Sequence, residues 1–103
     1  MSSDQNGELD KSWRFVTNHT QVLIAIARNP DARTRDIADE VGITERAAQR
    51  IVADLSEAGY IEITRVGRRN NYSVNREITM RHPAQAHHEV GELLDLLEPE
   101  ENR

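Results

Sequence analysis

The chain has 103 residues, of which 37% are hydrophobic, and a formal net charge of −5. This length supports one compact domain and excludes a second hydrophobic core. The absence of cysteine excludes disulfide bonds and thiolate metal sites, and the polar first residues lack the apolar stretch of a secretory signal. We therefore expect a cytoplasmic protein that does not enter a membrane. Because only 4% of its residues are aromatic, its core should consist of aliphatic side chains packed between helices.

The charges are unevenly distributed along the chain. Residues 44–76 carry six basic and four acidic side chains, whereas residues 77–103 carry two basic and seven acidic ones. A surface that binds phosphate responds to charges within a Debye length of about 8 to 10 Å more than to the net charge of the protein. The net negative charge therefore does not exclude nucleic acid as a partner of the middle segment.

Apolar residues recur at helical spacing between residues 15 and 26 and predict a first helix. Thr17 or Asn18 is a cap or a break within this pattern. The helix should end near Asn29, because Pro30 follows.

Two further helices are predicted from their start and stop signals. Thr34 offers an N-cap hydroxyl for a second helix, which runs to about Val41 and ends at Gly42. Thr44 caps a third helix, which runs to Gly59, since glycine commonly follows the last helical residue.

The third predicted helix has an apolar and a polar face. The apolar positions follow helical spacing and should point inward: Ala48, Ile51, Val52, Leu55 and Ala58. The polar face begins with Glu45, Arg46, Gln49 and Arg50. These residues lie in the N-terminal half of the helix, which is the half that contacts base edges in a recognition helix.

A hairpin should follow the third helix. Ile61 and Ile63 alternate with polar residues, and Tyr72 and Val74 resume the alternation after a turn at residues 66–71. This pattern predicts two antiparallel strands with a basic tip.

The last predicted element is a helix from Ala84 to Leu97, between Pro83 and Pro99. Its apolar residues form a seam of the kind that pairs two helices, and we expect a homodimer through this seam. The expected interface residues are Val90, Leu93, Leu94 and Leu97. The alternative is that the seam folds back on its own domain.

The order of these features resembles a known class of protein. The run TRDIADEVGITERAAQRIVADLSEAGYI, which starts at Thr34, and the basic hairpin tip at residues 68–70 are similar to winged helix-turn-helix regulators of bacteria and archaea, the broad group that contains the MarR-like and ArsR-like families. The similarity covers Val22 to Val74. It implies a mainly α fold with a small β-hairpin, and a transcriptional regulator that binds double-stranded DNA.

In such a protein the third helix, residues 44–59, enters the major groove, and the wing, residues 65–71, contacts the backbone or the minor groove. Threonines at helix starts help backbone N–H groups meet phosphates. The predicted DNA-binding residues are Thr34, Thr44, Glu45, Arg46, Gln49, Arg50, Arg65, Arg68, Arg69 and Asn70.

Other chemistry finds less support in the sequence. His87 and His88 are adjacent and diverge around a helix, and His19 and His82 lie far from them in the chain, so we expect no metal site and no cofactor. Carboxylates lie on polar faces without a nucleophile motif, so we expect no enzyme. Two alternatives stay open: a winged helix used for protein–protein contact, which the net charge of −5 favours, and a ligand- or metal-responsive sensor that also binds DNA.

The expected organisation of the chain has four parts. Residues 1–11 form a flexible tail, residues 12–76 the winged helix-turn-helix domain, residues 77–98 a linker and a C-terminal dimerisation helix, and residues 99–103 a second flexible tail.

Overall fold

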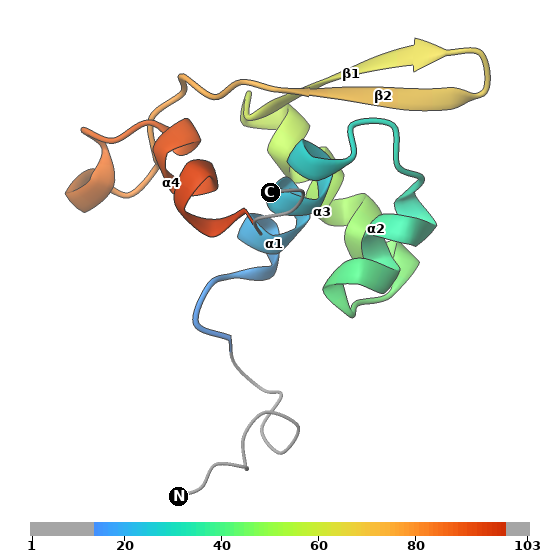
Figure 1. Cartoon of the computed structure of the whole chain (residues 1–103), viewed down its shortest axis with the longest axis horizontal. Helices are drawn as coiled ribbons and strands as arrows, with labels where there is room; N and C mark the ends of the chain where they lie inside the picture. Colours follow the sequence, from blue (N-terminus) through green and yellow to red (C-terminus); the bar gives the residue numbers. More distant parts are fainter. Residues whose placement is uncertain (1–13, 99–103) are drawn as a thin grey trace, which may run out of the picture.

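The computed structural model describes residues 14–98, which form four α-helices and one antiparallel hairpin (Figure 1). The elements are α1 (Asn18–Arg28), α2 (Thr34–Val41), α3 (Glu45–Glu57), β1 (Ile61–Val66), β2 (Arg69–Val74), the short 3-10 helix η1 (Pro83–Gln85) and α4 (Val90–Leu97). The predicted mainly α fold with a small hairpin and a C-terminal helix is confirmed. The predicted tails at residues 1–11 and 99–103 lie outside the described residues.

Two of the first three helices begin at the predicted caps. The side-chain hydroxyl of Thr17 accepts a hydrogen bond from the backbone N–H of Thr20 at 3.2 Å, and that of Thr44 accepts one from Ala47 at 3.0 Å. The start of α2 differs, because Arg33 is its N-cap and makes no side-chain cap bond. Thr34 is the first helical residue, so its predicted role as the cap is wrong.

The ends of α2 and α3 depend on glycine. Gly42 follows α2 with a φ of 85° and Gly59 follows α3 with a φ of 88°, a conformation that L side chains rarely adopt. The backbone N–H of Gly59 donates to the carbonyl of Ser56, and that of Tyr60 to the carbonyl of Leu55, at 3.1 and 2.9 Å. This pattern is the Schellman motif, and it ends α3 at Glu57, two residues before the predicted limit.

The core lies between α1, the apolar faces of α2 and α3, and the base of the hairpin. Val22 and Ile26 of α1 are fully buried, and Ile37 of α2 and Ala48 of α3 are at most 1% exposed. All buried side chains of the described residues are apolar apart from the tyrosine hydroxyls. Each large one contributes about 1.5 to 3 kcal/mol to the free energy of unfolding.

The hairpin pairs Ile61 with Val74 at its base and Val66 with Arg69 at its tip. A two-residue turn closes it, with Gly67 at a φ of 64°. The backbone N–H of Tyr72 also donates to the carbonyl of Pro30, between α1 and α2, at 2.8 Å. The hairpin is therefore attached to the α1–α2 turn while its tip extends past the helices (Figure 1).

The C-terminal helix begins at Val90, so its predicted start at Ala84 is wrong. The backbone N–H of Val90 donates to the carbonyl of Ile78 at 2.8 Å, and that of Met80 to the carbonyl of His88 at 3.1 Å. These bonds close residues 78–90 into a loop that contains η1. Glu89 then starts α4 with a capping box, in which the side chains of Glu89 and Glu92 each accept the other residue's backbone N–H.

The apolar seam of α4 packs partly on its own chain. Leu94 is fully buried and Val90 is 4% exposed, so the expectation that these two residues meet a second copy is wrong. Their side chains fill the same core as α1, as in the alternative where the seam folds back. Leu93 and Leu97 are half-buried, and Leu96 is 77% exposed.

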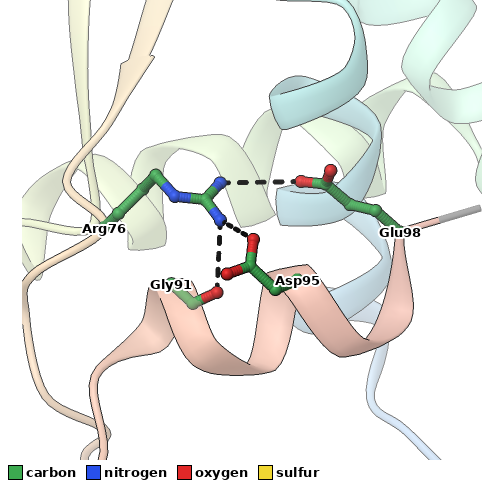
Figure 2. Close-up of polar contacts among 4 residues, drawn as sticks. All are labelled: Arg76, Gly91, Asp95 and Glu98. Carbon is green, nitrogen blue, oxygen red and sulfur yellow. Dashed lines mark hydrogen bonds and ion pairs between the residues drawn. The ribbon is translucent and has the colours of Figure 1, made fainter.

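Arg76, which follows β2, fixes the position of α4 (Figure 2). One guanidinium nitrogen donates to the carbonyl of Gly91 at 3.2 Å and to the carboxylate of Asp95, and the other lies 3.6 Å from the carboxylate of Glu98. Gly91 donates its backbone N–H to the carbonyl of Arg76 at 2.8 Å. A Cβ atom at Gly91 would lie 3.0 Å from both the Cβ and the carbonyl oxygen of Arg76, a contact tighter than nearly all real Cβ contacts, so the close approach favours glycine.

Candidate nucleic-acid interface

The polar face of α3 is open to solvent over its N-terminal half. The predicted residues Thr44, Glu45, Arg46, Gln49 and Arg50 are all exposed. The opposite face is buried through Ala48, Ile51, Val52 and Leu55. The core therefore fixes the rotation of the helix and leaves the polar residues directed away from it.

The two halves of this polar face differ in their interactions. Within residues 14–98, the side chains of Arg46, Gln49 and Arg50 form no hydrogen bond or ion pair. Further along, the carboxylate of Asp54 lies 2.9 Å from Nε2 of His19 on α1. The C-terminal half of α3 is thus tied to α1, whereas the N-terminal half keeps its donors available to a partner.

A cleft of about 210 Å³ separates the hairpin from the start of α2. It brings together five of the predicted residues, and its lining is Ala32, Arg33, Thr34, Arg65, Arg68, Arg69, Asn70 and Tyr72. Four of these eight residues are arginines and none is acidic. The cleft is therefore a concentrated positive site, although the whole chain is acidic.

Arg33 is a functional candidate that the sequence pattern did not single out. It precedes α2 in a turn, and only the fold shows that it faces the hairpin across the cleft. A signal was present in the sequence, because a cation at a helix N-terminus opposes the helix dipole and is unusual there without an anion nearby.

The four arginines of the cleft have different partners. One terminal guanidinium nitrogen of Arg69 donates to the backbone carbonyl of Asp31 at 2.7 Å, and Nε of Arg65 donates to the carbonyl of Gly67 at 3.4 Å. Arg33 and Arg68 make no hydrogen bond or ion pair within the described part of the chain. Arg69 therefore joins the hairpin to the α1–α2 turn, while the donors of Arg33 and Arg68 are not used by any residue from 14 to 98.

A second cavity, of about 650 Å³, lies between α1, α3 and α4. Its lining is mainly apolar and includes Leu23, Leu55, Met80 and Leu93, together with the His19–Asp54 pair. Within residues 14–98, no three or more metal-ligating side chains come together. No helix in the same range is long and apolar enough to cross a membrane.

The histidines near α4 interact with its start. Nδ1 of His88 lies 2.7 Å from Oε1 of Glu92, and Glu92 also accepts the backbone N–H of Glu89 at 3.1 Å. The hydrogen bond from His88 is the largest cause of a lowered pKa of Glu92, and the bond from the backbone of Glu89 lowers this pKa further. His82 accepts the backbone N–H of Ala84 through Nδ1 at 3.0 Å and so caps η1. Both interactions support local backbone structure.

The arrangement of three helices followed by a hairpin, with a tight glycine turn between α2 and α3, defines a winged helix-turn-helix protein. A sequence model of the MarR family matches residues 17–69, just over half of the chain, and the chain therefore belongs to the MarR family. This is a family of transcriptional regulators and not of enzymes. No curated protein matches the chain.

Proposed function

We propose that this protein is a homodimeric transcriptional regulator that binds specific sequences of double-stranded DNA and acts in the cytoplasm. The observation that carries the proposal is the set of arginines on α3 and beside the hairpin that form no hydrogen bond or ion pair within residues 14–98. An exposed guanidinium can bind base edges and phosphates through its planar fork of donors. The MarR-family fold supports the same function.

The proposed roles follow from the position of each residue. α3 enters the major groove, where Arg46 and Arg50 suit guanine and Gln49 suits adenine. Thr34 and Thr44 lie at helix starts and suit phosphates, and Glu45 lies between Thr44 and the base-reading residues. The wing, residues 65–71, supplies affinity through the backbone or the minor groove. In this arrangement residues 12–76 bind DNA, and residues 77–98 form the linker and the dimer interface.

The dimer interface is proposed for the exposed side of α4. Leu96 is 77% exposed and Leu93 and Leu97 are half-buried, so these three residues retain apolar surface that a second copy would cover. Sedimentation of the unmodified protein at tens of micromolar should show a dimer, and Leu96→Glu should shift it to a monomer. Val66→Glu, at a 61% exposed position on the hairpin, is the control and should stay dimeric. A monomeric unmodified protein contradicts the dimer.

A substitution on α3 tests base reading. Gln49→Ala should lose about 1 to 3 kcal/mol of binding free energy on a preferred duplex and little on random duplex, because only the correct base supplies its partner. Fluorescence anisotropy with both duplexes measures the difference. Gln85→Ala, which removes an exposed glutamine at η1, is the matched control and should bind as the unmodified protein does. Absence of duplex binding at low salt favours a protein–protein module instead.

The cavity between α1, α3 and α4 favours a second candidate function, that of a DNA-binding sensor for a small apolar ligand. Its volume of about 650 Å³ and mainly apolar lining are typical of ligand sites, and Asp54 and Leu55 of α3 contribute to it. A ligand that binds only the folded chain raises the thermal midpoint as its concentration increases. A screen of small aromatic compounds by thermal shift tests this candidate, and Leu23→Trp, which fills the cavity, should abolish any such shift.

A further inference from the structure

We infer that the cleft between the hairpin and the start of α2 is a seat for a single phosphate group, bound by Arg33, Arg65 and Arg68, and that Arg69 positions the hairpin wall of this seat. The inference rests on the proposed function and adds to it. DNA binding by itself does not require several arginines to converge on one phosphate.

The charge of the cleft indicates an anionic ligand. Four arginines line about 210 Å³ together with Thr34, Asn70, Ala32 and Tyr72, and among the described residues no Asp or Glu lines it. Like charges gathered in one place repel each other, and a bound anion offsets this repulsion. The carboxylates that pair with arginines elsewhere, such as Glu40 with Arg28 at 2.6 Å, do not reach this cleft.

The arrangement of the donors favours phosphate among anions. Arg33 approaches from the start of α2, Arg65 from β1 and Arg68 from the hairpin tip, so the donors belong to separate elements. A carboxylate presents two oxygens in one plane and suits a single guanidinium fork, whereas phosphate presents oxygens in several directions. The donors of Arg33 and Arg68 have no partner within residues 14–98, and Arg65 has only the long bond to Gly67.

The walls of the cleft are held in place without a ligand. Arg69 donates to the carbonyl of Asp31 at 2.7 Å, and the backbone N–H of Tyr72 donates to the carbonyl of Pro30 at 2.8 Å. Both bonds join β2 to the α1–α2 turn, at positions two and three residues before Arg33. The spacing between Arg33 and the hairpin is therefore set before binding, which reduces the entropic cost of binding a phosphate.

Methylphosphonate substitution of a selected duplex tests the seat, because it removes the charge of one phosphate at a time. At one position in each half-site, the substitution should weaken binding of the unmodified protein about tenfold, as expected when a charged hydrogen-bond partner is removed. At that position it should weaken binding of the double variant Arg33→Gln, Arg68→Gln only about two- to threefold, because Arg65 is the one proposed phosphate ligand that remains. Arg81→Gln removes an exposed arginine near η1 and should retain the full tenfold effect.

The salt dependence of binding tests whether the arginines share one phosphate. The slope of log affinity against log salt changes by about 0.9 for each phosphate that the protein no longer neutralises. If Arg33 and Arg68 bind the same phosphate, the double variant should lower the slope by no more than about 0.9 per protomer, whereas separate phosphates give about 1.8. The larger value overturns the single seat.

Arg69 is tested as a positioning residue with the same methylphosphonate duplex. Arg69→Lys retains a donor for the carbonyl of Asp31 and should keep the methylphosphonate effect, whereas Arg69→Ala should reduce it. An unchanged effect in Arg69→Ala overturns the positioning role. Circular dichroism of each variant checks that the exposed substitutions leave the fold intact.

Inorganic phosphate distinguishes the two possible sources of the group. If the seat serves a free phosphate compound, phosphate should raise the thermal midpoint of the unmodified protein above that in chloride of equal ionic strength, but not that of the double variant. That result, together with duplex binding that no methylphosphonate position weakens, supports the seat and assigns it to a free phosphate compound instead of DNA. If the protein binds duplex, but no methylphosphonate position depends on Arg33 and Arg68 and inorganic phosphate does not change the thermal midpoint, the seat is overturned and the proposed function stands. Absence of duplex binding overturns the proposed function, and the phosphate measurement then decides on the seat.

Discussion

The two ends of the molecule use arginine in different ways. Near α4, the guanidinium of Arg76 interacts with the carbonyl of Gly91 and the carboxylates of Asp95 and Glu98 (Figure 2). Near the hairpin tip, Arg33 and Arg68 have no such partners in the described chain. Burial does not explain the contrast, since the side chain of Arg76 is itself 42% exposed. The difference lies in the acidic residues. Asp95 and Glu98 neutralise an arginine at the α4 end, whereas no acidic residue of the described range lines the cleft at the other end.

The contrast predicts that substitutions near α4 affect folding, whereas those near the hairpin affect binding. The largest effect on folding should come from Leu94→Ala, because Leu94 is fully buried. It should lower the free energy of unfolding by about 2 to 5 kcal/mol. Val66→Ala, at a 61% exposed hairpin position, should stay within about 0.5 kcal/mol of the unmodified protein. Urea denaturation measures both, and equal effects of the two substitutions contradict the account.

Gly91→Ala should lower the free energy of unfolding by about 1 to 3 kcal/mol. A Cβ atom there would lie 3.0 Å from the Cβ and the carbonyl oxygen of Arg76, so Arg76 or α4 must shift by a few tenths of an ångström. Without this steric conflict, alanine would stabilise the helix by about 1 kcal/mol relative to glycine. The sign of the change in a thermal melt therefore decides whether the close approach exists, and a raised melting temperature argues against it.

Arg76→Gln should have a smaller effect, a decrease of about 0.2 to 1 kcal/mol in the free energy of unfolding, because its partners are partly exposed. The decrease should be smaller at high salt. Arg68→Gln removes an arginine that has no partner among the described residues, so it should leave the free energy of unfolding unchanged while it weakens duplex binding. If Arg68→Gln lowers the free energy of unfolding as much as Arg76→Gln does, arginine contributes equally to folding at both ends, which contradicts the comparison.

Glu92→Gln should have a small effect on the free energy of unfolding, and this effect should depend on pH. Hydrogen bonds from His88 and from the backbone of Glu89 lower the pKa of Glu92 in the folded chain. A carboxylate with a lowered pKa stabilises the folded state above its unfolded pKa, and this contribution is lost as the pH falls through the folded value. The unmodified protein should therefore be slightly more stable than Glu92→Gln at neutral pH, and chemical denaturation at a series of pH values should show the difference vanish in acid. A difference that persists there contradicts this origin.

The helix-turn-helix core was predictable because its signals are local. Thr17 and Thr44 lie three residues from the N–H groups that they cap, and Gly42 and Gly59 permit positive φ where α2 and α3 end. The start of α4 was not predictable in this way. It depends on backbone bonds that join residues 78–80 to residues 88–90. The spacing of apolar residues predicts a helix but does not report such bonds.

The candidate site was predictable in composition but not in its tertiary arrangement. The exposed residues of α3 follow from helical spacing alone. The bond from Arg69 to Asp31, 38 residues apart in the chain, and the position of Arg33 across the cleft follow only from the tertiary fold. The seam of α4 is ambiguous for another reason, since an apolar helix face has the same pattern whether it packs on its own core, as Leu94 does, or on a partner.

The central claim is that α3 and the hairpin form a DNA-binding surface that a dimer presents twice. Selection of bound duplexes from a random DNA pool by the unmodified protein tests this claim most directly. A two-fold dimer should enrich two inverted half-sites whose centres lie about 10 bp apart, or a multiple of that spacing. Enrichment of direct repeats, or of no sequence at all at low salt, would contradict it.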